Sequence, residues 1–154
     1  MAKEDVSLPV NPANLEAERS ILGALIFDDD SYLEEVLASG LRAEDFFLSD
    51  HCRIFQTIES LRAQKWPVDF LTVAEALGNR SEDFAVLSDL IQGVVLHRDH
   101  ILYHVRIVRR KAHLRALLRI SEWITSSIDE TSDPEPITAE IRKMLDACAE
   151  EVHA

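Results

Sequence analysis

The chain has 154 residues, enough for one domain or for a small globular part with a helical extension, and 47% of them are hydrophobic, enough for a core. Its net charge of −12 argues against a protein that coats nucleic acid, because affinity for phosphate groups comes from clustered Lys and Arg. Apolar runs are short, the N-terminus lacks the apolar segment of a secretion signal, and the two cysteines, Cys52 and Cys148, form no CxxC pair. We therefore expect a cytoplasmic protein without a membrane span.

Apolar residues follow helical spacing throughout, and no segment alternates apolar and polar residues as a strand does, so we predict an all-α fold. Residues 1–11 are predicted to form a flexible tail. The first helix follows Pro12, with Asn14 as its N-cap, and ends at 28–30, where three aspartates occur in a row. Its predicted buried face consists of Leu15, Ile21, Leu22, Leu25 and Ile26.

Two helices are predicted between the first helix and residue 67. A short one passes through 32–37 and stops near Gly40, because glycine readily takes the left-handed conformation that closes a helix. Ser49 is predicted to cap the next one, which ends where Trp66 and Pro67 break the helical pattern.

Two further short helices complete a compact helical head. Either Asp69 or Thr72 caps the first of them, since 72–75 also has the spacing of a capping box, and Gly78 closes it. The second begins at Ser81 and ends near Gly93.

A longer helical pattern then runs from Asp99 to about Ile128 without Gly or Pro, which corresponds to about 45 Å of helix. Residues 133–136, with two prolines, are predicted to form a loop, and a last helix follows with one apolar face: Ile137, Ile141, Met144, Leu145 and Cys148. A long helix, a loop and a second helix predict an antiparallel hairpin. We therefore divide the chain into a helical head at 12–97 and a helical hairpin at 98–154.

The glycine positions exclude the common phosphate-binding and nucleophile motifs. Gly23, Gly40, Gly78 and Gly93 are followed by Ala, Leu, Asn and Val, so GxxxxGK[ST], GxGxxG and GxSxG cannot occur. We expect no catalytic residue and no bound nucleotide in this chain.

Two groups of residues invite a chemical role that we reject on spacing. His97, His100 and His104 are separated by three or four residues, as ligands on one helix face are, but they lack further ligands, and surface histidines are the simpler interpretation. His51 and Cys52 are adjacent and so point in different directions on a helix, which makes Cys52 a core residue rather than a nucleophile. We predict no metal site.

The long helix carries most of the positive charge. Between Arg98 and Ile120 seven basic residues face one acid, a local charge of +6, which leaves −18 on the rest of a chain of net charge −12. The basic residues are Arg98, Arg106, Arg109, Arg110, Lys111, Arg115 and Arg119. Three interpretations stay open: a solvated flank paired with acidic residues of the chain, a docking site for an acidic partner, and direct contact with DNA, which the surrounding negative field opposes.

The apolar residues of this helix predict more than one packing partner. Ile101, Val105, Val108, Ala112, Leu117, Ile120 and Ile124 form one drifting stripe, whereas Ile107, Leu114 and Leu118 lie off it. One hairpin partner covers only one side of a helix, so we predict self-association. The predicted self-association or partner surface consists of Ile107, Arg109, Arg110, Leu114, Leu117, Leu118, Ile124, Ile141, Met144 and Leu145.

Several motifs, in order, resemble those of the N-terminal domains of DnaB-type bacterial replicative DNA helicases. The resemblance spans roughly 14–115 and rests on the following segments: PANLEAERSILGAL at 12–25, Asp45-Phe46-Phe47, His51 with Arg53-Ile54-Phe55, Pro67-Val68-Asp69 with Leu71-Thr72-Val73-Ala74, and Tyr103 with Ile107-Val108-Arg109 and Lys111.

The resemblance implies a head and a hairpin whose hairpins pair into dimers, assembled in the full-length family as a hexameric collar above the ATPase ring. It implies docking of primase, and in some systems of a helicase loader, while ATP, Mg²⁺ and DNA are handled by a C-terminal RecA-like motor that these residues do not include. Alternatives are the helicase-binding domain of a primase, which has a similar head and hairpin, or a stand-alone nucleic-acid-binding or adaptor protein acting through 106–119. A hydrolase is the weakest alternative, because no catalytic constellation is found.

Overall fold

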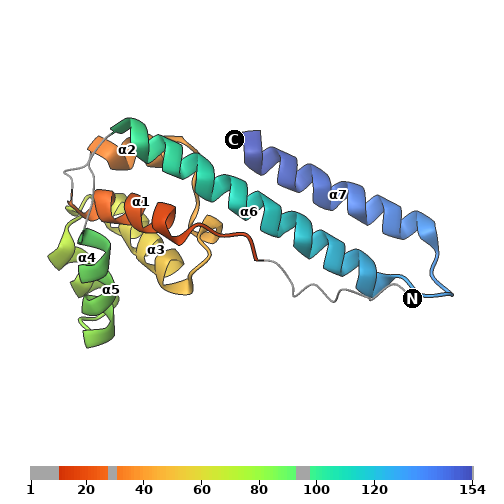
Figure 1. Ribbon diagram of the computed structural model, residues 1–154, viewed down its shortest axis with the longest axis horizontal. Helices are drawn as coiled ribbons and strands as arrows, with labels where there is room; N and C mark the ends of the chain where they lie inside the picture. The colour runs from red at the N-terminus through yellow and green to blue at the C-terminus, as the bar shows by residue number, and fades with distance from the viewer. Residues whose placement is uncertain (1–10, 28–30, 93–97, 154) are drawn as a thin grey trace, which may run out of the picture.

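The computed structural model describes residues 11–27, 31–92 and 98–153, and within them the chain forms seven α-helices, one 3-10 helix and no strand, as predicted. The short helices gather around one end of the long helix α6, and α7 runs back antiparallel beside its other half (Figure 1). The elements are α1 (Leu15–Phe27), α2 (Ser31–Ala38), η1 (Ala43–Asp45), α3 (Ser49–Ala63), α4 (Phe70–Leu77), α5 (Ser81–Ile91), α6 (Arg98–Ser127) and α7 (Pro134–His153). None of these helices combines the length and the apolar character needed to cross a membrane.

Local capping interactions explain where α1 and α4 begin and end. Asn14 Oδ1 accepts a hydrogen bond from Ala17 N at 3.0 Å, which confirms the predicted N-cap of α1. Asp69 caps α4: its Oδ1 accepts from Thr72 N at 2.9 Å, and Thr72 Oγ1 accepts from Asp69 N at 2.9 Å. Gly78, at φ 104°, closes α4 in the left-handed conformation, as predicted.

The start of α3 differs from the prediction. Leu48 occupies the N-cap position without a side-chain hydrogen bond, and Ser49 is the first helical residue rather than the cap. The preceding η1 was not predicted; there Asp45 Oδ2 accepts from Arg42 N at 2.9 Å. A short 3-10 turn is fixed by such contacts rather than by apolar periodicity, so the sequence pattern misses it.

The predicted loop at 133–136 is wrong as well. Pro134 is the first residue of α7, a position that favours proline because its missing N–H needs no partner there. Asp133 Oδ1 accepts from Glu135 N at 3.2 Å, so the aspartate before the proline starts the helix. Residues 1–10 of the predicted tail at 1–11, the predicted end of the first helix at 28–30, and Gly93 lie outside the described residues.

α1 lies at the centre of the head and is buried on nearly all sides. Every residue from Ile21 to Ile26 is buried, because α1 packs against α3, α5 and α6. The largest fully buried side chains around it include Phe55, Ile58 and Leu87. Leu15, predicted to be buried, is only half-buried.

α6 takes part in two packing units. Ile101, Val105 and Val108 on its first half belong to the same buried core as α1, whereas its second half packs against α7. The division of the chain into a head at 12–97 and a hairpin at 98–154 stays a prediction. The first half of α6, which it assigns to the hairpin, packs in the core of the head.

Candidate interaction surface of the helical hairpin

The apolar residues of α6 do not all pack against the same element. The predicted stripe splits: Ile101, Val105 and Val108 face the head, and Ile120, only 6% exposed, is buried beyond it. The expectation of one continuous seam along the helix is therefore corrected, because the head covers the first half of the seam before α7 reaches it.

Beyond the head, the hairpin leaves apolar side chains exposed. Leu114 is 39% exposed, Leu117 36% and Leu118 37% on α6, and Leu145 is 43% exposed on α7. Of the other predicted surface residues, Ile124, Ile141 and Met144 are half-buried. Two helices cover only part of each other's circumference, so these leucines remain without a covering element in the described part of the chain.

Two residues of the predicted surface face the head instead. Ile107 packs against the head core, and Arg109 Nη1 donates to Ser39 O at 2.6 Å. Arg110, one residue later, is exposed. The predicted set is therefore not one surface, since its first members belong to the junction between head and hairpin.

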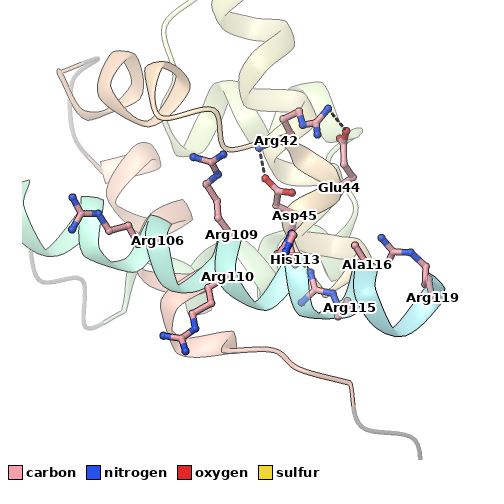
Figure 2. A pocket seen from close by; sticks show the side chains of 11 residues that line it. Arg42, Glu44, Asp45, Arg106, Arg109, Arg110, His113, Arg115, Ala116 and Arg119 are labelled. Carbon is pink, nitrogen blue, oxygen red and sulfur yellow. Dashed lines mark hydrogen bonds and ion pairs between the residues drawn. The ribbon is translucent and has the colours of Figure 1, made fainter. Parts of the chain in front are cut away.

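That junction contains a cavity of about 400 Å³, which we call the basic groove. Figure 2 shows Arg109 and Arg119 extending from α6 toward the side where Arg42 and Glu44 lie, Arg106 nearer the start of the helix, and Arg110 extending from the opposite side of α6. The full lining is Arg42, Glu44, Asp45, Arg106, Arg109, Arg110, Ala112, His113, Arg115, Ala116 and Arg119.

Arg115 joins three segments across the wall of this groove. Its Nη1 donates to Pro12 O at 2.7 Å, its Nη2 donates to Asp45 O at 2.6 Å, and its Cζ lies 5.5 Å from the centroid of the Phe47 ring. Burial lowers the pKa of the Arg115 guanidinium. The sequence grouped Arg115 with the other basic residues, but its place two turns after the buried Val108 marks the face that points to the head.

The carboxyl of Asp45 is also affected by its place in the wall. Burial raises its pKa, and the hydrogen bond from the Arg42 backbone and the charge of Arg42 oppose that rise. The charge of Arg109 also opposes the rise in the pKa of Asp45. Arg109 and Arg115 thus both donate to backbone carbonyls of the head and lie close enough to its acidic residues to interact with them electrostatically.

A buried polar cluster beneath the groove escaped the sequence prediction. Glu18 is 1% exposed, and its carboxylate accepts from Phe47 N at 3.0 and 3.2 Å and lies 3.0 Å from His51 Nδ1. From sequence Glu18 was only an acidic residue in the first turn of a helix. Cys52 is half-buried, its Sγ donates to Phe46 O at 3.2 Å, and burial raises the pKa of its thiol.

The histidines considered as metal ligands are placed as follows. His97 lies outside the described residues, and burial together with the neighbouring His100 lowers the pKa of His104. Among the described residues, no group of three or more His, Cys, Asp or Glu side chains is arranged to hold a metal ion.

Comparison with known proteins matches residues 10–110 to the family model described as DnaB-like helicase N terminal domain. The replicative DNA helicase DnaB of Pasteurella multocida is 32% identical over 167 aligned residues, covering 100% of this chain and 34% of that protein. The DnaB of Treponema pallidum is 32% identical over 125 residues, covering 76% of this chain and 27% of that protein. The chain therefore spans about a third of the length of these relatives.

Solved structures agree with the sequence relatives. The N-terminal domain of DnaB helicase from Mycobacterium tuberculosis superimposes with a TM-score of 0.69 at 26% identity, covering 94% of this chain and 100% of that chain. A DnaB-like replicative helicase, described with its interactions with primase, shares the fold at a TM-score of 0.61 and 21% identity, with 91% of this chain covered and 31% of that one. The head and hairpin are thus the fold of a known domain, and the chain belongs to the family of DnaB-like helicase N-terminal domains.

Proposed function

We propose that this chain is an assembly and docking module of a replicative DNA helicase, and that it works by binding rather than by catalysis. The observation that carries the proposal is the exposed leucine surface of the hairpin, Leu114, Leu117, Leu118 and Leu145, in a chain of this family. Monomeric proteins rarely leave such side chains together in solvent, and a second hairpin supplies the apolar surface to cover them.

A symmetric pair is the simplest assembly that this surface supports. In a two-fold dimer each hairpin presents the same patch to its partner, so the exposed leucines of both copies become buried. Dimers of this kind are the building blocks that we propose for a hexameric collar.

Replacing two of these leucines tests the pairing. Each of Leu114 and Leu118 still exposes enough surface for about 1 kcal/mol on burial, and a dimer buries four such side chains. Leu114→Gln with Leu118→Gln is therefore expected to raise the dimer dissociation constant on the order of 1000-fold. Analytical ultracentrifugation measures it. Leu71→Gln is the matched control, because Leu71 is 74% exposed on the head. A wild-type chain that stays monomeric at high concentration would contradict the pairing.

Docking of primase is the second part of the proposal, and binding of a helicase loader is a further docking role of the same module. The support is the family membership, together with the related helicase structure described with primase. We expect the C-terminal domain of the cognate primase to bind, measured by calorimetric titration. A hexameric full-length form that leaves this primase domain unbound would remove the recruitment role but not the pairing role.

We assign the remaining activities of a helicase to a part of the protein outside these residues. Handling of nucleotide and Mg²⁺ and translocation on DNA are assigned to a motor domain outside these residues, because the relatives named as replicative helicases extend well beyond the part that this chain matches. A cytoplasmic location follows from a role in replication. In this chain the glycines do not fit a P-loop, so its own contribution is to hold partners together.

A further inference from the structure

The basic groove concentrates positive charge in an acidic chain. Six arginines and two carboxylates line it, whereas the chain as a whole has a net charge of −12. Concentrating cations on one concave surface costs free energy through mutual repulsion unless anions offset it. The groove therefore has the electrostatic character of a binding site for negative charge.

Half of these arginines are already engaged by the protein. Arg115 and Arg109 donate to backbone carbonyls of the head, and Arg42 Nη1 lies 3.5 Å from Glu44 Oε1. The carboxylate of Glu44 thus already pairs with one arginine of the groove, which shows the kind of group that these guanidinium groups bind.

The other three arginines are not engaged by the described residues. Arg106, Arg110 and Arg119 make no hydrogen bond or ion pair with any described residue, and all three are exposed. They follow α6 for 13 residues, so they are distributed over about 20 Å of helix. Cations spread over this length suit an extended ligand better than one compact anion.

The spacing along α6 also matches an extended polypeptide. One step of four residues along a helix is about 6 Å, as between Arg106 and Arg110. An extended strand rises about 3.3 Å per residue, so six consecutive residues cover about 20 Å, the separation of Arg106 and Arg119 along α6. Arg110 lies nine residues before Arg119, about half a turn around the helix, and Figure 2 shows the two side chains on opposite sides of α6. One extended peptide in the groove can therefore meet Arg106 and Arg119, but not Arg110 as well.

We propose that the basic groove binds a short acidic peptide segment in extended conformation, with carboxylates of the peptide paired to Arg106 and Arg119. Nucleic acid fits less well, since no Phe, Tyr or Trp lines the groove for base stacking and the rest of the chain carries −18. The proposal does not depend on hairpin pairing, because Arg106 and Arg119 lie outside the surface assigned to it.

The test is fluorescence anisotropy with an eight-residue labelled peptide that has aspartate at every second position, added to the 154-residue chain. We expect saturable binding that weakens with added salt, and about tenfold weaker binding by Arg106→Gln with Arg119→Gln. Arg142→Gln with Lys143→Gln is the matched control, since it removes the same charge from exposed positions of α7 outside the groove, and it should change the affinity by less than about twofold. Dimerisation of the groove variant should equal that of the wild type.

Four results would overturn the proposal. These are no binding of the aspartate peptide, equal binding of the peptide with asparagine in place of aspartate, equal losses in the groove and control variants, and tighter binding of a single-stranded oligonucleotide of the same charge. The last result would assign the groove to nucleic acid instead.

Discussion

Glu18 is the most buried charged side chain in the described part of the chain, and its surroundings explain why it is tolerated there. Its carboxylate reaches from α1 to the start of α3, where it accepts from Phe47 N and contacts His51 Nδ1. Phe47 precedes the N-cap of α3, so its N–H has no partner within the helix, and the carboxylate of Glu18 supplies the acceptor that this partly buried N–H requires. This contact fixes how α1 and α3 meet.

Replacing Glu18 should therefore destabilise the head strongly. Glu18→Ala leaves Phe47 N and His51 Nδ1 buried without their acceptor, and we expect the free energy of unfolding to fall by about 2–4 kcal/mol. Urea denaturation measures it. The control is Glu16→Ala, two residues earlier, whose side chain is 85% exposed and whose ion pair with Arg19 contributes little, below about 0.5 kcal/mol. Similar losses for the two variants would mean that the buried cluster does not stabilise the head.

At the scale of elements, the long helix is attached to the head by more than apolar packing. Arg115 holds the segment before α1 and the end of η1 against α6 through two backbone carbonyls. These carbonyls belong to irregular segments that no ladder or helix satisfies, so the guanidinium supplies hydrogen bonds that their own elements do not. The end of η1 is therefore held by α6 in addition to its own contact between Arg42 N and Asp45 Oδ2.

Replacing the guanidinium of Arg115 with the amine of lysine tests this attachment. Lysine keeps the charge but cannot donate to two carbonyls in a fixed fork or stack on Phe47 in the same way, so Arg115→Lys should lower the free energy of unfolding by about 1–3 kcal/mol. Arg119→Lys, one turn later and exposed, serves as the comparison and should change it by less than about 0.5 kcal/mol. Hydrogen exchange at Phe46 and Phe47 should rise only in the first variant. Unchanged exchange there would contradict the role of Arg115.

At the scale of the whole molecule, α6 is shared between two bodies of unequal stability. The head buries side chains from α1 to α5 and from the first half of α6, whereas α7 packs principally against α6. A two-helix hairpin buries little apolar area, so its outer half depends on a further partner for stability. The molecule thus presents a stable head and an extended arm suited to association.

Ending the chain after Ser127 should separate the stability of the head from the association of the hairpin. The shortened chain keeps the core residues Ile101, Val105 and Val108, so we expect cooperative urea unfolding to persist, with dimerisation lost. A chain ended before Ile101 is the comparison and should not fold, because it lacks three side chains of the core. Circular dichroism and sedimentation measure both outcomes. Loss of cooperative folding in the first chain would show that α7 is part of the head's stability.

Sequence patterns located most elements because helix ends depend on near neighbours. The N-caps Asn14 and Asp69 each bond a backbone N–H three residues away, and Gly78 needs only its own backbone freedom. Ser49 and Pro134 were misplaced by such local rules because each is compatible with two adjacent positions at a helix start. The family resemblance needed only the order of the motifs, and the comparisons confirm it.

The sequence by itself thus determined that the protein is helical, where its helices lie within a few residues, and to which family it belongs. Only the tertiary structure decided that the apolar stripe of α6 is divided between head and α7, and that Glu18 is buried. It also decided that Arg115 bonds to the head, whereas Arg119 makes no hydrogen bond or ion pair with the described residues. The physical reason is separation along the chain: Glu18 and Phe47 are 29 residues apart, and Arg115 and Pro12 are 103 apart. Periodicity describes a helix's own faces, but the fold alone decides what each face meets.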